Sequence, residues 1–198
     1  MSKRKASSQK SELRIIGGQW RGRRLSFTAA EGLRPTLDRF RETLFNWLMF
    51  DVEGAHCLDL FAGSGALGLE ALSRGAAHVD FIDNNALAVA AIRQHLKSLQ
   101  CSAAQVHQAA AEAWLKQQPS QPYDLIFLDP PFHQDFLQPC FYALEYGGWL
   151  KSGSLIYLEA EAEFSTAKLP AGWQIQKNKL TKTKIFLLLR FEPPDNPQ

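Results

Sequence analysis

The chain has 198 residues, of which 45% are hydrophobic, and its 22 lysines and arginines slightly outnumber its 20 acidic residues. This length allows one domain of good size with a small appendage and excludes an assembly of several domains. No segment approaches the roughly 20 uninterrupted apolar residues that cross a bilayer, and the first residues lack the apolar core of a signal peptide, so we expect a cytosolic protein without a membrane partner. Cys57, Cys101 and Cys140 show no C-x-x-C spacing, which indicates neither a disulfide framework nor a metal site.

Positive charge is concentrated at the start of the chain, where 11 of the 22 lysines and arginines fall within the first 41 residues. Such asymmetry is typical of a nucleic-acid partner, although a solvated tail explains residues 1–11 equally well. Beyond that tail, Arg21, Arg23 and Arg24 alternate with Gly22 among apolar residues, which indicates a short hairpin that carries the arginines. The other comparable basic cluster consists of Lys177, Lys179, Lys182 and Lys184.

Residues 36–50 show apolar positions at helical spacing and predict a docking helix. The pattern then alternates, with strands predicted at 56–61, 79–82, 105–108 and 125–128 and helices at 66–74, 86–99 and 110–116. Three further strand-like runs follow at 155–158, 173–180 and 184–191. We therefore expect an α/β fold: a Rossmann-like, doubly wound, mostly parallel sheet with a C-terminal antiparallel hairpin, plus a small N-terminal basic hairpin and helix.

The first predicted strand leads into a glycine-rich loop, Asp59-Leu-Phe-Ala-Gly63-Ser-Gly65-Ala-Leu-Gly68. The spacing G-x-G-x-x-G alone is a weak signal, because several kinds of nucleotide-binding protein share it. Asp59 narrows the choice, since a carboxylate at a strand tip repels a pyrophosphate but attracts an ammonium or sulfonium group. Asp83 ends the second strand, where an acid accepts hydrogen bonds from ribose hydroxyls. S-adenosylmethionine matches these two acids better than NAD does. In the alternative interpretation, the glycine turn binds no ligand and only packs, and Asp59 caps a neighbouring backbone group.

A second motif, Asp129-Pro-Pro-Phe132, follows the apolar run 125–128. Prolines cannot donate to a sheet ladder, so the strand must end here and Asp129 lies at its tip. Open α/β sheets bind their ligands at the carboxyl ends of their strands. In the alternative interpretation Asp129 is a turn residue and Phe132 is a core aromatic. His133, the next residue, could touch a substrate, but a lone loop histidine is more often solvated, so we expect no catalytic role for it.

These motifs resemble known families. The first resembles motif I of class I S-adenosylmethionine-dependent methyltransferases, and the second resembles motif IV of enzymes that methylate exocyclic amino groups of nucleobases. Three N-terminal segments resemble the ribosomal small-subunit methyltransferase D family: Arg14-Ile-Ile-Gly-Gly-Gln-Trp-Arg-Gly-Arg-Arg24, Leu33-Arg-Pro-Thr36 and Arg41-Glu-Thr-Leu-Phe-Asn46. This resemblance implies methyl transfer from S-adenosylmethionine to the N2 amine of a specific guanine in 16S rRNA, within the assembled or assembling small ribosomal subunit, by a monomer that needs no metal.

With this resemblance the chain divides into a basic tail at 1–12, a hairpin and docking helix at 13–52, a methyltransferase domain at 53–192 and a flexible tail at 193–198. The expected catalytic residues are Asp129, Pro130 and Phe132. Cofactor contacts are expected from Asp59, Phe61, Gly63, Gly65, Asp83, Asn84, Ala110, Thr36 and Arg41. RNA contacts are expected from Arg14, Arg21, Arg23, Arg24, Arg34 and Pro131.

One departure from the family pattern concerns the segment after the third strand. Related enzymes often carry Gly-Asp-Ala there, and the acid contacts the adenine end of the cofactor. This chain has Ala109-Ala110-Ala111, which leaves the backbone N–H of Ala110 as the replacement for that contact.

The second motif suits an exocyclic amine. The amino nitrogen of guanine is a poor nucleophile that becomes positive during methyl transfer, so acceptors aimed at its two hydrogens favour the transition state. Asp129 and the carbonyl of Pro130 supply two acceptors, and Phe132 offers a ring face for stacking. A paired base could not reach such a pocket, so the target must be unstacked or already single-stranded.

Two other functions remain open at this point. The second motif also suits a DNA adenine-N6 or cytosine-N4 methyltransferase, but such enzymes usually need a separate target-recognition domain, for which this chain is too short. A non-catalytic RNA-binding or ribosome-assembly factor is the other alternative, and the intact Asp59, Gly63, Gly65 and Asp129 argue against it.

Overall fold

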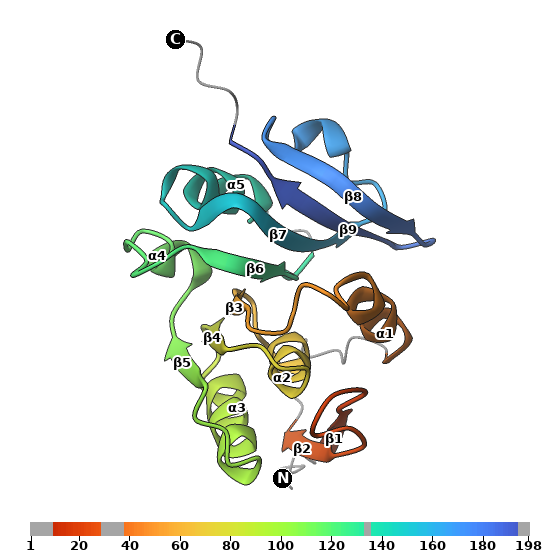
Figure 1. Cartoon of the computed structure of the whole chain (residues 1–198), viewed down its shortest axis with the longest axis vertical. Coiled ribbons are helices and arrows are strands. Elements are labelled where there is room, and N and C mark those ends of the chain that lie inside the picture. Colours follow the sequence, from red (N-terminus) through yellow and green to blue (C-terminus); the bar gives the residue numbers. More distant parts are fainter. Residues whose placement is uncertain (1–9, 29–37, 133–135, 194–198) are drawn as a thin grey trace, which may run out of the picture.

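A seven-stranded sheet forms the centre of the computed structural model, which describes residues 10–28, 38–132 and 136–193 (Figure 1). The strand order is β5-β4-β3-β6-β7-β9-β8. The bounds are β3 His56–Asp59, β4 His78–Asp83, β5 Ala104–Gln108, β6 Tyr123–Leu128, β7 Leu150–Glu161, β8 Trp173–Leu180 and β9 Lys184–Phe191. From β5 across to β7 neighbouring strands pair in parallel, whereas β9 runs antiparallel to both β7 and β8. The expected sheet with its C-terminal antiparallel hairpin is confirmed.

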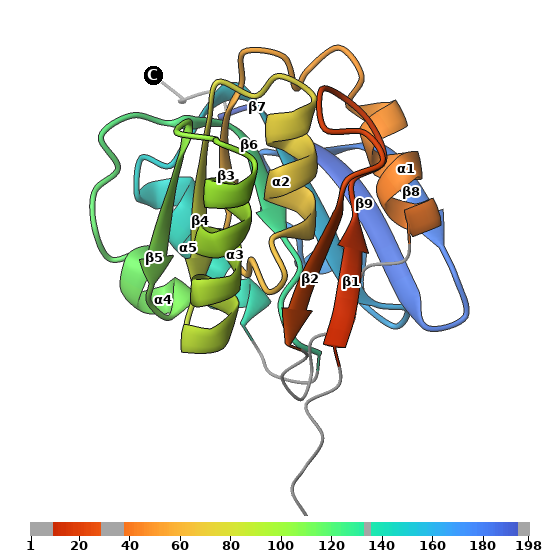
Figure 2. The same ribbon diagram turned by 90° about the horizontal axis from the view of Figure 1, so that it is seen from below.

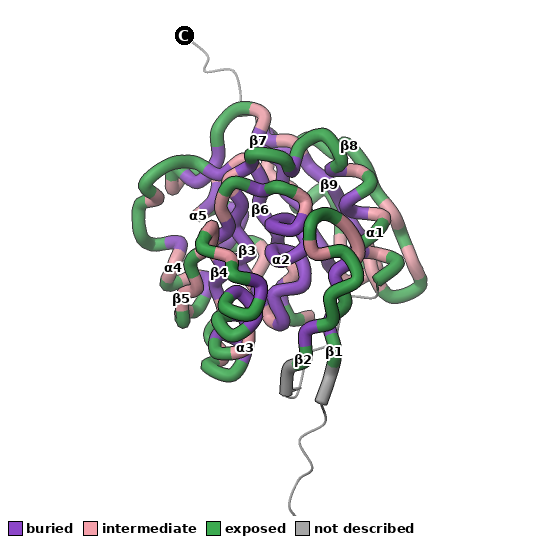
Figure 3. The backbone as a smooth tube through the Cα atoms, turned by 60° about the horizontal axis from the view of Figure 1, so that its bottom comes forward, coloured by how far each residue is buried: buried purple, intermediate pink, exposed green. Residues whose placement is uncertain are grey.

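Helices cover both faces of the sheet (Figure 2). On one face lie α1 (Asp38–Trp47), α2 (Ala66–Ser73) and α3 (Ala86–Ser98), and on the other lie α4 (Ala111–Trp114) and α5 (Leu137–Tyr146), while a short 3-10 helix, Thr166–Lys168, precedes β8. Each face has its own buried apolar cluster, because successive side chains of a strand point to opposite sides. All eight residues of α2 are buried. The helix is purple in Figure 3, between α3 and α1, so α2 is the central helix of its layer.

The N-terminal hairpin consists of β1 (Lys10–Arg14) and β2 (Arg24–Thr28), which pair antiparallel as expected. Leu13 lies opposite Leu25, and both are buried in the same apolar cluster as α1 and α2. The segment that joins the two strands is hydrogen-bonded to α2: the N–H groups of Ile16 and Gly17 each donate to the carboxylate of Glu70 at 2.8 Å. This docking fixes the hairpin beside the sheet.

One helix was not predicted from the sequence. In α5, Pro139 falls in the first turn, where a helix needs no backbone donor, so the proline does not prevent helix formation. Gly147 and Gly148 then end the helix directly before β7. The predicted helix at 36–50 is observed only from Asp38 to Trp47, and its first two positions lie outside the described residues. Within the described ranges, no helix has the length and apolarity needed to cross a membrane.

Candidate active site

Four carboxylates lie on one face of the sheet at the carboxyl ends of neighbouring strands. Asp59 of β3 pairs in register with Phe81 of β4 and with Phe127 of β6. Side chains two residues apart share a face, so Asp83 and Asp129 lie on the same face as Asp59, one pleat further along. Because Phe127 pairs with Tyr157 of β7, Glu159 lies on this face too. The carboxyl ends of β4, β3, β6 and β7, which are neighbours in the sheet, therefore carry a row of four carboxylates beside the glycine-rich loop. We call this row the acidic edge.

Glycine is required at two positions of this loop and the following helix. Gly65 has a φ of +76°, and a side chain there would also press against Ile92 of α3. At Gly68 an added Cβ would lie 2.2 Å from the ring of Phe81, so only glycine lets α2 lie this close to β4. The loop is thus shaped by its contacts with the sheet and with α3.

Asp83 is held by both of its carboxylate oxygens, one bonded to the glycine-rich loop and the other to the start of α3. One accepts a hydrogen bond from the N–H of Gly63 at 2.7 Å, and the other accepts from the N–H of Asn85 at 2.8 Å. Each oxygen of a carboxylate has a second lone pair, so both remain able to accept from a ligand hydroxyl. The side chain is partly exposed and fixed in position.

Asp59 is more enclosed than the sequence suggested. Its exposed fraction is 2%, and its Oδ2 accepts a hydrogen bond from the N–H of Gly68 at 3.0 Å. Asp59 therefore caps the first turn of α2, the alternative that the sequence had left open. Burial raises the pKa of Asp59, the hydrogen bond from the Gly68 N–H opposes the rise, and the charge of Asp83 adds to it, so that the resulting pKa is about 7. Any attraction of Asp59 for a cationic ligand thus acts alongside a structural hydrogen bond.

The second motif lies where the sequence placed it, directly after β6. Asp129 is partly exposed, Pro130 is buried and Pro131 is exposed. Loss of water around its carboxyl group raises the pKa of Asp129, the nearby Glu159 raises it further, and Lys184 opposes the rise. The ring of Phe132 is partly buried, with the ammonium of Lys184 4.8 Å from its centroid. His133 lies outside the described residues.

Sequence reasoning missed Glu159 and the role of Lys184 in this site. Glu159 is fully buried, pairs with Lys184 of β9, and accepts a hydrogen bond from the hydroxyl of Tyr157. The predicted strand ends at residue 158, and Lys184 belongs to the basic cluster predicted in the C-terminal hairpin. A usable signal was present, since Glu159 follows a buried apolar run in the same way as Asp129 does.

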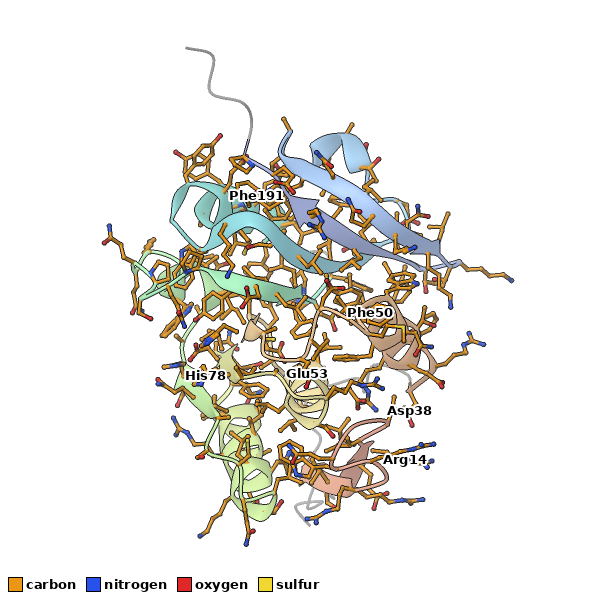
Figure 4. The ribbon with its side chains drawn as sticks, viewed as in Figure 1. Arg14, Asp38, Phe50, Glu53, His78 and Phe191 are labelled. Carbon is orange, nitrogen blue, oxygen red and sulfur yellow. The ribbon has the colours of Figure 1, made fainter. Side chains whose placement is uncertain are left out.

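Arg41 lies in the contact between α1 and the N-terminal hairpin. Its exposed fraction is 1%, and its guanidinium donates to the backbone carbonyl of Arg14 and, at 2.8 Å, to the carboxylate of Asp38. Figure 4 labels Arg14 on the hairpin and Asp38 at the start of α1. These contacts show Arg41 joining two structural elements, and its contact with a cofactor stays a prediction. Arg34 and Thr36 lie outside the described residues.

Three further predicted cofactor residues lie around the carboxyl ends of β3, β4 and β5. Phe61 is partly buried and its ring centroid lies 5.8 Å from that of Phe136. Asn84 is exposed directly after Asp83. Ala110 precedes α4 and its carbonyl accepts from the N–H of Trp114, and within the described part of the chain its own N–H donates no hydrogen bond. That N–H is therefore available to a ligand.

The arginines of the hairpin point to solvent. Arg14 and Arg24 are exposed and lie directly opposite each other across the two strands, an unfavourable pairing of like charges. Arg24 also forms an exposed ion pair with Glu12 at 3.3 Å, and Arg23 donates to the carbonyl of Ser98. Arg21 is exposed in the connecting segment. A bound anion would relieve the repulsion on this surface.

No group of three or more His, Cys, Asp or Glu side chains with the geometry of a metal site occurs in the described ranges.

Comparison with known proteins places this site in a family. Residues 13–190 match the family model described as conserved hypothetical protein 95. The chain is 43% identical over 185 residues to Ribosomal RNA small subunit methyltransferase D of Escherichia coli K12, which covers 93% of each chain. The protein of the same name from Haemophilus influenzae is also 43% identical, over 91% of this chain and 95% of that one. The solved structure of yhhF from Escherichia coli superposes with a TM-score of 0.85 at 40% identity, covering 92% of this chain and 99% of that chain. The chain therefore belongs to the ribosomal RNA small subunit methyltransferase D family.

Proposed function

We propose that this protein transfers a methyl group from S-adenosylmethionine to the exocyclic N2 amine of a guanine in 16S rRNA of the small ribosomal subunit. The observation that carries the proposal is the placement of Asp129 on the same sheet face as Asp59 and Asp83, one strand away from the glycine-rich loop. A cofactor held over that loop would present its reactive end to the Asp129 motif. Relatives named as ribosomal RNA small subunit methyltransferases cover nearly the whole chain, which supports RNA as the substrate.

The chemistry of the acidic edge fits S-adenosylmethionine. A pyrophosphate over the loop would face the carboxylates of Asp59 and Asp83, whereas a sulfonium or ammonium group is attracted by them. Asp83 would hold the ribose hydroxyls, and Asp59 would attract the positive end of the ligand. The adenine would lie among Phe61, Asn84 and the N–H of Ala110, with Gly63 and Gly65 forming the loop around the ligand. Thr36 and Arg41 complete the proposed cofactor set. When bound, the cofactor supplies an electrophilic methyl group.

The Asp129 motif would act on the amine. The Asp129 carboxylate accepts a hydrogen bond from one amine hydrogen and the Pro130 carbonyl accepts from the other, which draws electron density onto the nitrogen as it attacks. The amine must also lose a proton, which the Asp129 carboxylate would take. Because Pro130 and Pro131 restrict the backbone, both acceptors are held in place before the base arrives.

The hairpin would bind the RNA backbone. Arg14, Arg21, Arg23 and Arg24 are exposed on an element fixed to α2 by Glu70, so contacts with phosphates there would fix the RNA relative to the pocket without reading its bases. Arg34 and Pro131 complete the proposed RNA surface.

Replacing Asp83 with alanine should weaken S-adenosylmethionine binding by roughly 1.5 to 3 kcal/mol through loss of charge-assisted hydrogen bonds. The larger value is expected, because alanine also releases the N–H of Gly63 and loosens the loop. Asp83→Asn keeps one acceptor oxygen and should lie between the wild type and alanine. Titration calorimetry measures all three proteins, and tighter binding of NADH than of S-adenosylmethionine would contradict the assignment of the cofactor.

The affinity for S-adenosylmethionine should rise with pH because of Asp59. Its pKa of about 7 means that at lower pH the carboxyl must lose a proton before it attracts a cation. Affinity should therefore increase by up to about tenfold per pH unit from about pH 5.5 to about pH 7 and then level off. In Asp59→Asn the amide oxygen still accepts from Gly68 but does not titrate, so this variant should bind more weakly and without the pH dependence. A wild-type affinity that does not change over this pH range would remove Asp59 from the cofactor site.

The substrate class is tested with methyl-labelled S-adenosylmethionine and three acceptors: small ribosomal subunits that lack the modification, naked 16S rRNA and duplex DNA. The proposal predicts label in ribosomal RNA, with the subunit as the better acceptor. Label in DNA alone would favour the nucleobase methyltransferases of DNA, and cofactor binding without transfer to any acceptor would favour a non-catalytic assembly factor.

A further inference from the structure

The contact between α1 and the C-terminal strands brings two cations to one aromatic ring. Phe40 of α1 stacks on Phe186 of β9, with ring centroids 4.5 Å apart and an angle of 16° between the ring planes. The guanidinium carbon of Arg39 lies 5.3 Å from the centroid of the Phe40 ring, and the ammonium of Lys179 on β8 lies 5.2 Å from it. Two residues that are far apart in the sequence therefore place their charges at the same ring.

The ammonium of Lys179 is held by groups that carry no negative charge. It donates to the hydroxyl of Thr43 at 3.4 Å, and that hydroxyl donates in turn to the backbone carbonyl of Arg39 at 3.0 Å. Among the residues that the structure describes, neither Lys179 nor Arg39 forms an ion pair. Lys184 on the neighbouring strand, by contrast, pairs with the buried Glu159. Lys179 is therefore fixed in position while its charge is not neutralised.

This arrangement of charges suits an anionic ligand. An aromatic face attracts a cation but carries no net charge, so it does not cancel the repulsion between two cations. Arg39 is exposed and Lys179 is partly exposed, so both can be reached from solvent. Arginine and lysine side chains of this kind bind the phosphates of a nucleic-acid backbone and release its counterions. A phosphate that lies between the two cations would remove their repulsion.

The two cations lie beside the proposed pocket for the target base. Glu159 of the acidic edge pairs in register with Phe186, and Phe186 pairs in register with Lys179. Residues directly opposite each other share a face of the sheet, so Lys179 lies on the face that carries the acidic edge. Because β8, β9, β7 and β6 are successive neighbours, Lys179 lies three strand spacings, about 14 Å, from the strand whose tip carries Asp129. RNA on either side of a base bound at Asp129 would reach it.

The N-terminal hairpin lies on the other side of the pocket. It is hydrogen-bonded to α2 and α3, and these helices contact β3, β4 and β5, whereas Lys179 lies on the strand at the opposite edge of the sheet. Figure 1 shows α1 between the hairpin and the strands β8 and β9, and contacts of Arg41 and Phe40 join α1 to both. The two basic surfaces therefore flank the pocket and are connected by α1.

We propose that Arg39 and Lys179, held together at Phe40, form a second phosphate-binding site that contacts the RNA backbone across the pocket from the hairpin. This inference rests on the proposed methylation of ribosomal RNA and adds a contact that the hairpin does not supply. Binding of the backbone at both sides would fix the target nucleotide over Asp129 while leaving its base free to enter the pocket.

Arg39→Gln/Lys179→Gln should flatten the plot of log affinity for small ribosomal subunits against log salt by roughly 1.4 to 1.8 units, the change expected for two lost phosphate contacts. Arg39→Lys/Lys179→Arg keeps both charges and should keep the slope of the wild type. Lys116→Gln/Lys168→Gln removes two exposed charges elsewhere and should also leave the slope unchanged. The affinity for S-adenosylmethionine should be the same in all four proteins.

A purely structural role of the two cations predicts a different result. If they serve only to hold α1 against β8 and β9, the double glutamine variant should have a lower melting temperature and an unchanged salt slope, which would overturn the inference. Lys179→Gln alone leaves Arg39 at the ring and should flatten the slope by roughly half as much as the double variant, so the test does not depend on the double variant alone.

Steady-state kinetics separate this inference from the proposed function. A phosphate contact is made equally before and during the reaction, so Arg39→Gln/Lys179→Gln should raise KM for the subunit and leave kcat within a few fold. An active wild type beside a double variant with unchanged KM and salt slope would overturn the inference and leave the proposed function in place. Conversely, a wild type that binds subunits with the slope lost in the double variant, yet transfers no methyl group, would refute the proposed function and support the phosphate site.

Discussion

Replacing Asp129 with alanine should lower the rate of methyl transfer about 100- to 1,000-fold, the usual cost of removing one preorganised group that stabilises transition-state charge. Asp129 lies at the tip of β6, held between the strand and the buried Pro130, so an acceptor is lost without a change in the glycine-rich loop. Affinity for S-adenosylmethionine should stay within a few fold, because the proposed contact is made to the amine.

Asp129→Asn removes the negative charge of the side chain and keeps its shape, so it separates the two contributions. Asparagine keeps one carbonyl oxygen to accept from the amine but cannot take its proton, so its rate should lie between those of alanine and the wild type. Glu163→Ala, at an exposed acid just after β7, controls for loss of negative charge near this end of the sheet. Single-turnover assays with saturating cofactor measure the rates, and wild-type turnover by Asp129→Ala would exclude the proposed mechanism.

Changing Arg21, Arg23 and Arg24 together to glutamine should produce the largest loss of RNA affinity. If each arginine neutralises one phosphate, the slope of log affinity against log salt should flatten by roughly 2 to 3 units. The affinity advantage of the wild type over the variant should then be about 1,000-fold larger at 50 mM salt than at 1 M salt. The structure adds a reason to expect this, since Arg14 and Arg24 lie opposite each other across the hairpin and a bound phosphate would lower their mutual repulsion. Cofactor affinity should barely change.

Two control variants locate the effect. Lys116→Gln/Lys168→Gln removes exposed charges from other parts of the surface and should leave the salt slope near that of the wild type. Lys177→Gln/Lys182→Gln tests the C-terminal hairpin, the other basic cluster. Binding to ribosomal subunits is measured across a salt series. An unchanged slope in the arginine variant, with a flattened slope in the C-terminal variant, would move the RNA surface to β8 and β9.

Local patterns in the sequence were sufficient to predict the sheet and the placement of two aspartates at the carboxyl ends of its strands. Alternating strands and helices predicted the parallel arrangement, and the positions of Asp83 and Asp129 follow directly from strands that end at them. In both cases the structural cause lies within a few residues of the aspartate.

Contacts between distant segments could not be predicted in this way. Glu70 looks like an ordinary polar position of α2, yet it is buried because the hairpin more than fifty residues earlier donates two hydrogen bonds to it. Glu159 and Lys184 meet only because β9 inserts between β7 and β8, an order that strand patterns do not reveal. The capping role of Asp59 similarly depends on how close α2 approaches β3. Each of these features is set by tertiary packing rather than by spacing in the sequence.

The identity of the methylated nucleoside tests the central claim most directly. Small ribosomal subunits that lack the modification are incubated with the protein and methyl-labelled S-adenosylmethionine, and the 16S rRNA is then digested to nucleosides and separated. We expect the label to be recovered as N2-methylguanosine and to map to a single position, with Asp129→Ala giving none above background. Label recovered as a methylated adenosine or cytidine, or spread over many guanosines, would contradict this expectation.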